Sequence, residues 1–170
     1  MEERIVYLNG EVNEISALNV IMELLNYDAE DPKTPIYLYL NSNGGSVVHG
    51  LSIYDTIKHI NAPVYMVCAG LAASMGAFLL SCGEKGHRAA LKHSQILIHQ
   101  PLIRSDYSYP EKESDIRKEA EGLLECRQIL ESIMAENTNK PLEVLHKDME
   151  RDNWMNAEEA KEYGLIDEII

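Results

Sequence analysis

The sequence predicts an α/β fold of repeated strand-turn-helix units around a largely parallel sheet. Short apolar runs, typical of buried strands, alternate along the chain with segments of helical period. Glycines lie at the boundaries where a strand-like run is followed by a helix-like segment. The chain has 170 residues, of which 45% are hydrophobic and 25% charged. This length and composition suit one globular domain over residues 1–170, and no repeat or linker indicates a second.

The first half of the chain is expected to contain three strands and two helices. Residues 5–8, 36–40 and 64–69 are short apolar runs with the length of buried strands. The glycine-containing residues 41–45 are expected to form a turn that closes the second strand, and residues 47–59 a helix after it. An earlier helix lies between the first two strands. Its apolar face consists of Ile15, Leu18, Ile21, Met22 and Leu25.

A short buried helix and two more strands are expected next. Residues 74–80 are small and apolar on all sides, a composition that favours burial over an amphipathic helix. Residues 88–91 and 95–98 are again short apolar runs that predict strands.

Three helices are expected in the last third. Residues 114–137 have a long helical pattern, and Pro141 is placed for the first turn of a short helix. Asn156 caps the last helix, with Glu159 three residues on and Gly164 at its end, as in a capping box with a C-terminal glycine.

Charge and cysteine content restrict the partners and the compartment. Twenty-eight acidic against fifteen basic residues give a net charge of −13, which repels phosphate backbones and anionic lipids, so we expect neither nucleic acid nor membrane as a partner. A solubility surface without any particular partner explains the same charge. The N-terminus is acidic where a signal peptide is basic, and the three cysteines form no C-x-x-C pair. We therefore expect a cytoplasmic protein.

Ser74 is the candidate nucleophile. It lies at an expected strand-to-helix turn, and a serine hydroxyl needs a base and oxyanion donors to become reactive. The start of a helix supplies free N–H groups, of which that of Met75 follows the serine directly. A second donor is expected from the turn at Gly44 and Gly45, because parallel strands end at one edge of a sheet.

His99 is the candidate general base, since it ends an expected strand and precedes a proline. A structural role is the alternative for any lone histidine. The other histidines lie in expected helices or polar stretches, and His87 and His93 lack the i, i+4 spacing of a helical metal pair. We expect no metal and no cofactor.

The third member of a triad does not follow from the pattern, because acidic residues are numerous. Asp152 lies in a short segment between two expected helices, where an ordinary turn or capping aspartate is the alternative.

Several motifs together resemble one known family. The segments Gly-Leu-Ala-Ala-Ser-Met-Gly-Ala-Phe-Leu-Leu (70–80) and Ile-His-Gln-Pro (98–101) resemble the two active-site signatures of the ClpP peptidases, the proteolytic subunits of Clp proteases. Residues 36–45 resemble the family's strand and glycine turn, and residues 150–169 its C-terminal segment. The resemblance extends over nearly the whole chain.

The resemblance implies a role for each matching residue. Ser74 becomes the nucleophile, His99 the base and Asp152 the acid that holds the imidazole. The oxyanion donors are implied at Gly45 and Met75. Backbone pairing with an extended peptide is implied for Gly44, Ser46, Val47 and Leu102.

An architecture is also implied: a crotonase-like fold whose head, about residues 1–100 and 141–170, carries a handle of a strand plus a long helix at about residues 101–140. Seven subunits would form a ring and two rings a closed chamber, a tetradecamer. Arg151 matches a position that pairs across the ring interface. A partner AAA+ ATPase would unfold the protein substrates.

Four features depart from the family's pattern. The family's N-terminal segment is expected to be absent, because the similarity begins near Glu3. Asn43 replaces a usual proline. Near the implied ATPase-docking pocket, which keeps Tyr37 and Tyr39, His59 and Ala89 replace aromatic residues. The handle after Pro101 lacks the glycine-rich stretch and is a few residues longer.

Three functions remain open on the sequence. The main hypothesis is a serine endopeptidase that hydrolyses unfolded polypeptides inside an oligomeric chamber, coupled to an AAA+ unfoldase. The second is a catalytically idle subunit of a mixed ring, which the altered docking pocket motivates. The third is a crotonase-fold enzyme acting on acyl-CoA, in which His99 would have no role.

Overall fold

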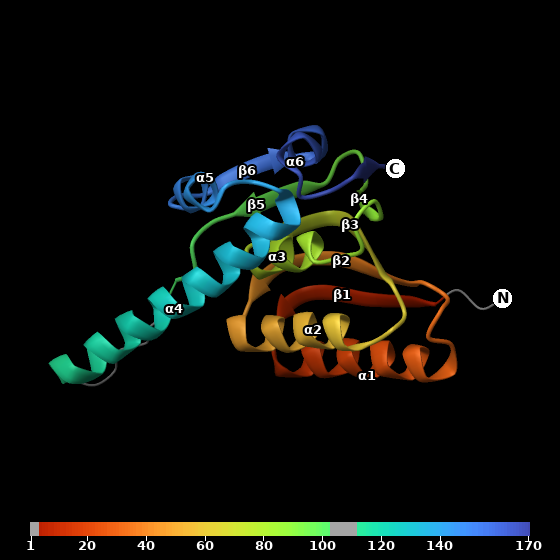
Figure 1. Ribbon diagram of the computed structural model, residues 1–170, viewed down its shortest axis with the longest axis horizontal. Helices are drawn as coiled ribbons and strands as arrows, with labels where there is room; N and C mark the ends of the chain where they lie inside the picture. The colour runs from red at the N-terminus through yellow and green to blue at the C-terminus, as the bar shows by residue number, and fades with distance from the viewer. Residues whose placement is uncertain (1–3, 103–111) are drawn as a thin grey trace.

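A seven-stranded sheet forms the centre of the computed structural model, which describes residues 4–102 and 112–170 (Figure 1). The strands are β1 Ile5–Val12, β2 Ile36–Gly45, β3 Val64–Ala73, β4 Arg88–Ala90, β5 Gln95–Ile98, β6 Asn153–Asn156 and β7 Glu168–Ile169. They pair in the order β1-β2-β3-β4-β7, while β5 pairs with β3 and β6. Only the β5–β6 pair is antiparallel. The predicted α/β class is confirmed.

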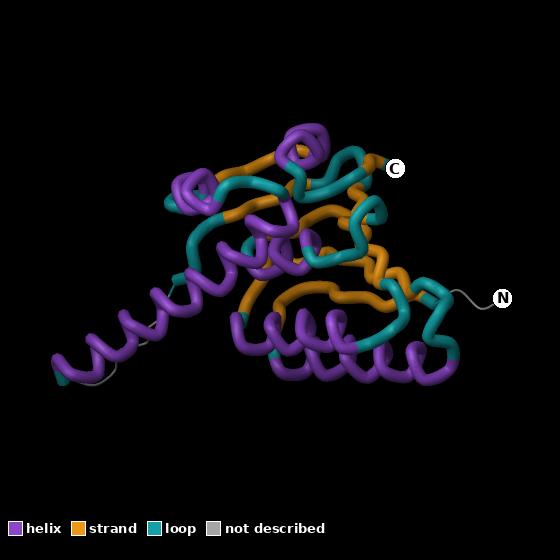
Figure 2. Tube along the Cα trace, viewed as in Figure 1, coloured by secondary structure: helices purple, strands orange, loops and turns teal. Residues whose placement is uncertain are grey.

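Six helices surround this sheet within the described residues (Figure 2). They are α1 Glu14–Glu30, α2 Val47–His59, α3 Met75–Ser81, α4 Glu113–Thr138, α5 Leu142–Asp148 and α6 Ala157–Tyr163. The first two pack side by side along one face of β1 and β2 (Figure 1). Helix α3 is buried at all seven positions, among β2, β3, α2 and α4. The N-terminal part of α4 projects away from the sheet (Figure 1).

Every predicted helix is present, and the capping motifs explain where two of them start. Asn13 accepts from the backbone N–H groups of Ile15 and Ser16 and begins α1. Asn156 and Glu159 form the predicted capping box of α6, which ends at Gly164 with φ +95°.

Of the five residues of the predicted apolar stripe on α1, only Ile21 packs against the core. The other members Ile15, Leu18, Met22 and Leu25 are 72%, 54%, 53% and 44% exposed, whereas Ala17, Val20 and Leu24 are buried. The small side chains of Ala17 and Val20 let the helix lie close to the sheet. Most of the predicted stripe is left on the outer surface.

Residues 41–45 do not form the predicted turn. The strand β2 continues through them to Gly45, with a register shift against β3 between Leu40 and Ser42. The chain extends here because β1 and β3 continue on both sides, and the glycines adopt φ values of +87° and +150° that other residues rarely reach. Strands β1 and β3 are likewise longer than predicted.

Two strands near the C-terminus are absent from the sequence prediction. Strands β6 and β7 have four and two residues, too short for a periodic signal. The strand predicted for the handle falls mainly on residues 103–111, outside the described residues.

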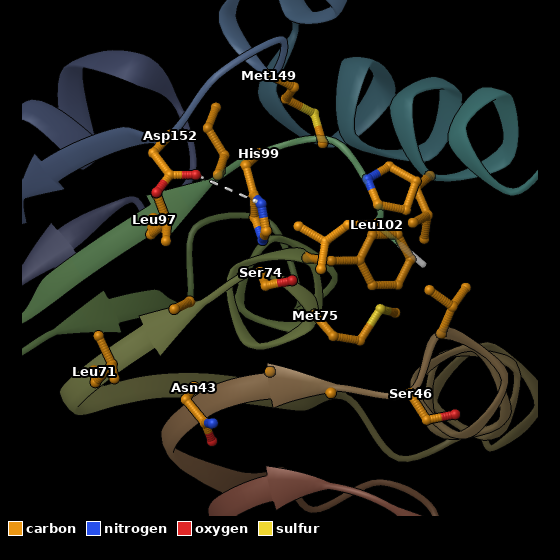
Figure 3. Close-up of a pocket in the computed structure, with 18 of the residues that line it drawn as sticks. Asn43, Ser46, Leu71, Ser74, Met75, Leu97, His99, Leu102, Met149 and Asp152 are labelled. Carbon is orange, nitrogen blue, oxygen red and sulfur yellow. Dashed lines mark ion pairs between the residues drawn. The ribbon is translucent and has the colours of Figure 1, made fainter. Parts of the chain in front are cut away.

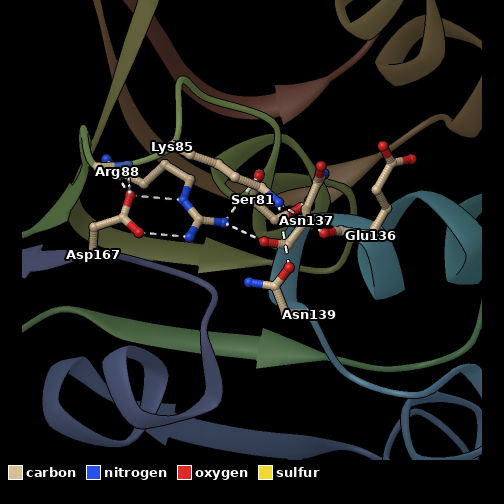
Figure 4. Close-up of polar contacts among 8 residues, drawn as sticks. Ser81, Lys85, Arg88, Glu136, Asn137, Asn139 and Asp167 are labelled. Carbon is tan, nitrogen blue, oxygen red and sulfur yellow. Dashed lines mark hydrogen bonds and ion pairs between the residues drawn. The ribbon is translucent and has the colours of Figure 1, made fainter.

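A buried arginine anchors the C-terminal strand to the sheet (Figure 4). Arg88, 4% exposed, donates to both carboxylate oxygens of Asp167 at 2.9 and 2.7 Å. It also donates to the carbonyl oxygens of Ser81 at 3.3 Å and Asn137 at 3.0 Å. One side chain thus joins β4 to α3, α4 and the segment before β7.

Candidate active site

Ser74 lies at a sharp turn between β3 and α3. Its backbone has φ 55° and ψ −119°, a region that residues with a side chain rarely adopt, so the turn holds local strain. Two hydrogen bonds fix it: Ser74 N–H donates to Leu97 O at 2.9 Å, and Phe78 N–H donates to Ser74 O at 3.0 Å. The predicted strand-to-helix turn is therefore present. The side chain of Ser74 lines a cavity (Figure 3).

Gly44 of β2 lies directly against this turn. A Cβ added to Gly44 would lie 2.7 Å from Ala73 O, 2.8 Å from Ser74 Cβ and 2.9 Å from Met75 N. Real Cβ atoms do not approach so closely, so only glycine fits between β2 and the serine turn. The N–H of Gly44 donates to the buried Ser42 Oγ at 3.1 Å.

His99 and Asp152 come together because β5 and β6 pair antiparallel. Ile98 faces Asn153 in this pair, so His99, just after β5, lies beside Asp152, just before β6. His99 Nδ1 is 3.7 Å from Asp152 Oδ1, and the two side chains are 14% and 66% exposed. This distance is longer than a hydrogen bond. Within the described part of the chain, no hydrogen bond joins Ser74 to His99.

These side chains line one cavity of about 710 Å³. Figure 3 shows His99 between Ser74 and Asp152, with β2 on the opposite wall. Every predicted catalytic, oxyanion and peptide-binding residue lines it, namely Ser74, His99, Asp152, Gly44, Gly45, Ser46, Val47, Met75 and Leu102. Arg151 is exposed, does not line the cavity and has no polar partner among residues 4–102 and 112–170.

Much of the cavity wall is apolar and was not identified from the sequence. These additional lining residues include Leu71, Phe78, Leu97, Leu130, Met134, Met149 and Trp154. Phe78 and Met134 come from α3 and α4, whose apolar patterns predict burial but do not distinguish a cavity wall from a filled core.

Around the implied docking pocket, aromatic rings lie on the outer side of the sheet. Tyr37 contacts Tyr65 edge-on at a centroid distance of 5.4 Å, and Tyr65 stacks on His87 at 3.9 Å. Ala89 is buried, whereas His59 is exposed.

An α/β fold that brings a serine, a histidine and a carboxylate to one cavity is typical of serine hydrolases. Comparison with known proteins narrows this class. The family model for Clp protease matches residues 1–170. The chain is 50% identical over 168 residues to the ATP-dependent Clp protease proteolytic subunit 2 of Prochlorococcus marinus (strain NATL2A), covering 99% of this chain and 82% of that protein. The chain therefore belongs to the Clp protease family, a family of serine peptidases.

Membership confirms the resemblance identified in the sequence and the serine endopeptidase part of the main functional hypothesis. It supports peptidase activity over action on acyl-CoA, and no observation favours an idle subunit. It also supports self-association and polypeptide substrates in general terms. None of the helices described in the structure is long and apolar enough to span a bilayer.

Proposed function

We propose that the chain is a serine endopeptidase that cleaves unfolded polypeptides with Ser74 as nucleophile, His99 as general base and Asp152 as the orienting acid. The observation that carries this proposal is the shared cavity, in which a strained serine turn faces a histidine that lies beside a carboxylate. His99 takes the Ser74 Oγ proton as Oγ attacks the peptide carbonyl carbon, and later returns it to the leaving amine.

Asp152 stabilises the imidazolium form of His99 during the attack. The Nδ1–Oδ1 separation of 3.7 Å needs to shorten by less than 1 Å for a hydrogen bond. Catalytic hydrogen bonds are often long in ligand-free structures and tighten when substrate binds. Closure around the peptide would complete the triad.

The backbone N–H groups of Met75 and Gly45 would hold the oxyanion. Met75 is the first residue of α3, so its N–H has no acceptor within the helix. Ser46 N–H donates to Val12 O at 2.8 Å, and successive N–H groups of a strand point to opposite sides. The N–H of Gly45 therefore faces away from β1. The N–H of Gly44 is occupied by Ser42, which leaves Gly45 as the glycine donor.

An extended peptide would lie between residues 44–47 and Leu102, all of which line the cavity. Pairing with backbone groups tolerates many side chains, as degradation of varied proteins requires.

The assembly proposed from family membership is two stacked rings of seven subunits, with residues 101–140 as the handle between rings. The projecting α4 and the exposed stripe on α1 are apolar surfaces that neighbouring subunits could cover. Arg151 would pair across the ring interface, and an AAA+ ATPase would deliver unfolded substrates. Native mass spectrometry should then give fourteen subunits of 19.2 kDa; a monomer would contradict this assembly.

A fluorophosphonate probe tests the chemistry directly. We expect the probe to label Ser74 in the assembled protein, and Ser74→Ala to abolish labelling and lower kcat on a fluorogenic peptide by about 10⁴-fold or more. Ser114→Ala is the matched control, because Ser114 is exposed on α4. This substitution should leave both the labelling and kcat unchanged. Failure of the assembled wild type to react would favour the idle-subunit hypothesis.

A further inference from the structure

A second cluster of charges lies next to the cavity, centred on Arg127 of α4. The side chain of Arg127 is 12% exposed, and its guanidinium donates four hydrogen bonds. Nε donates to Glu131 Oε1 at 2.6 Å and Nη1 to Gln100 Oε1 at 2.8 Å. Nη2 donates to Glu150 Oε2 at 3.0 Å and to His146 O at 3.1 Å.

Two of the four partners of Arg127, Gln100 and Glu150, belong to the segments that carry the candidate base and acid. Gln100 directly follows His99, and Glu150 lies two residues before Asp152. Gln100 also joins the segments itself, since its N–H donates to Met149 O at 2.6 Å and its Nε2 to Glu150 O at 2.9 Å.

The arginine is held in place by a buried carboxylate. Glu131 is only 4% exposed and also contacts His146 Nδ1 at 2.8 Å. Burial alone would lower the pKa of Arg127, but the hydrogen bonds and charges of Glu131 and Glu150 outweigh it and raise this pKa. The guanidinium is therefore a permanent charge in a fixed orientation, and its planar fork can hold several acceptors at once.

We propose that Arg127 is a positioning residue, which sets the distance between His99 and Asp152 by holding Gln100 and Glu150 from α4. The proposal rests on the proposed triad. The present 3.7 Å between His99 Nδ1 and Asp152 Oδ1 is close to the limit of a hydrogen bond, so displacements of a few tenths of an ångström decide whether Asp152 orients the imidazole. Arg127 does not line the cavity and touches no reacting atom.

A set of variants separates this role from a structural one. Arg127→Lys keeps a positive charge beside Glu131 and Glu150 but lacks the fork that reaches Gln100 at the same time. We expect it to keep the native mass and the unfolding temperature of the wild type. We expect kcat on a fluorogenic peptide to fall about 10- to 100-fold with little change in KM, as misplaced catalytic groups cause.

Gln100→Met removes the Arg127 contact in the residue after His99, together with the Nε2 bond to Glu150 O, and leaves every charge in place. It should produce a fall in kcat of the same kind, and it remains informative if Arg127→Lys destabilises the fold. Arg117→Ala is the matched control on the same helix, because Arg117 is 68% exposed and pairs only with Glu113 among the described residues. It should match the wild type.

The rate at which the fluorophosphonate probe labels Ser74 gives a second readout that does not depend on peptide binding. Absence of labelling in the wild type would contradict the proposed function. With a labelled wild type, unchanged kcat and labelling rate in both Arg127→Lys and Gln100→Met would overturn the positioning role. An equal loss in Arg117→Ala would overturn it too, since the effect would then belong to α4 as a whole.

Discussion

Two corners of the molecule combine a largely buried arginine with a glycine of nearly the same backbone conformation. At the cavity these are Arg127 and Gly44, with φ +87°, and at the β4–β7 corner they are Arg88 and Gly86, with φ +88°. A Cβ on Gly44 would collide with the serine turn, whereas one on Gly86 would meet nothing within 4 Å. The same backbone conformation thus allows the close approach of β2 to the serine turn at Gly44 and a reversal of the chain at Gly86.

The arginines differ in what they hold. Arg88 bonds a carboxylate and two carbonyl groups on elements that pack into the core, so its contacts join parts that are already fixed (Figure 4). Arg127 bonds side chains on segments at the cavity edge, one of them the exposed Glu150. We therefore expect changes at the first corner to affect stability and changes at the second to affect kcat.

Of the changes at these two corners, Gly44→Ala is expected to have the largest effect. The new methyl would displace Ser74 Cβ or Met75 N, and with them the nucleophile and an oxyanion donor. Loss of one oxyanion donor typically lowers kcat by about 10²- to 10³-fold, and we expect a loss of this size on a fluorogenic peptide.

Gly86→Ala is the matched control for this substitution. It introduces the same unfavourable φ, costing about 1 kcal/mol of stability, without any contact that could disturb the cavity. Its kcat per folded subunit should equal that of the wild type. Equal kcat losses in the two variants would mean that backbone strain, and not proximity to Ser74, is responsible.

A large effect on stability alone is expected for Arg88→Ala. The variant leaves Asp167 and the carbonyl groups of Ser81 and Asn137 without their donor, which should cost about 3 kcal/mol of unfolding free energy. For a chain of this length the melting temperature should fall by roughly 6–12 °C in a thermal scan at fixed protein concentration.

Activity of the folded fraction distinguishes the two corners. Arg88→Ala should keep its kcat per folded subunit, and Lys92→Ala, which removes an exposed cation near β4, should change neither quantity. A loss of kcat in folded Arg88→Ala would show that the two corners are coupled.

The sequence predicts the elements well where a local signal exists. The small and apolar character of residues 74–80 correctly indicates a buried helix, observed over Met75–Ser81, and the Asn156 and Glu159 box correctly marks the start of α6. The turn predicted at residues 41–45 is wrong, because a glycine pair gives the same local sequence signal in a strand as in a turn. Pairing with β1 and β3, which is a long-range effect, decides between them.

The site illustrates the same limit. Ser74 and Met75 follow from a strand-to-helix pattern, but the partnership of His99 with Asp152 depends on pairing between β5 and a four-residue β6 that has no recognisable pattern. The triad hypothesis therefore needed the family resemblance. Arg127 had no local signal at all, since its three side-chain partners are 4, 23 and 27 residues away and an arginine on a helix is normally exposed.

A smaller effect on stability than that of Arg88→Ala is expected at Asp167, where it depends on pH. Burial alone would raise the pKa of Asp167, but the hydrogen bonds from Arg88 and Gly86 and the Arg88 charge outweigh it and lower this pKa below its ordinary 3.8. A carboxyl group with a depressed pKa in the folded state stabilises the fold above its unfolded value, and this contribution is lost as pH falls through the folded value. Asp167→Asn should therefore lower the unfolding free energy at pH 7 by about 1.5 kcal/mol.

The difference between wild type and Asp167→Asn should stay constant down to about pH 5 and shrink below pH 3.8, measured by urea unfolding at fixed protein concentration. Asparagine does not titrate, and the other carboxyl groups titrate in both proteins, so their contributions cancel in the difference. Glu168→Gln is the matched control, because Glu168 is the next residue and is exposed. If the difference persisted unchanged at pH 3, the stabilisation would come from the shape of the side chain and not from its charge, and the corner would be held by hydrogen-bond geometry alone.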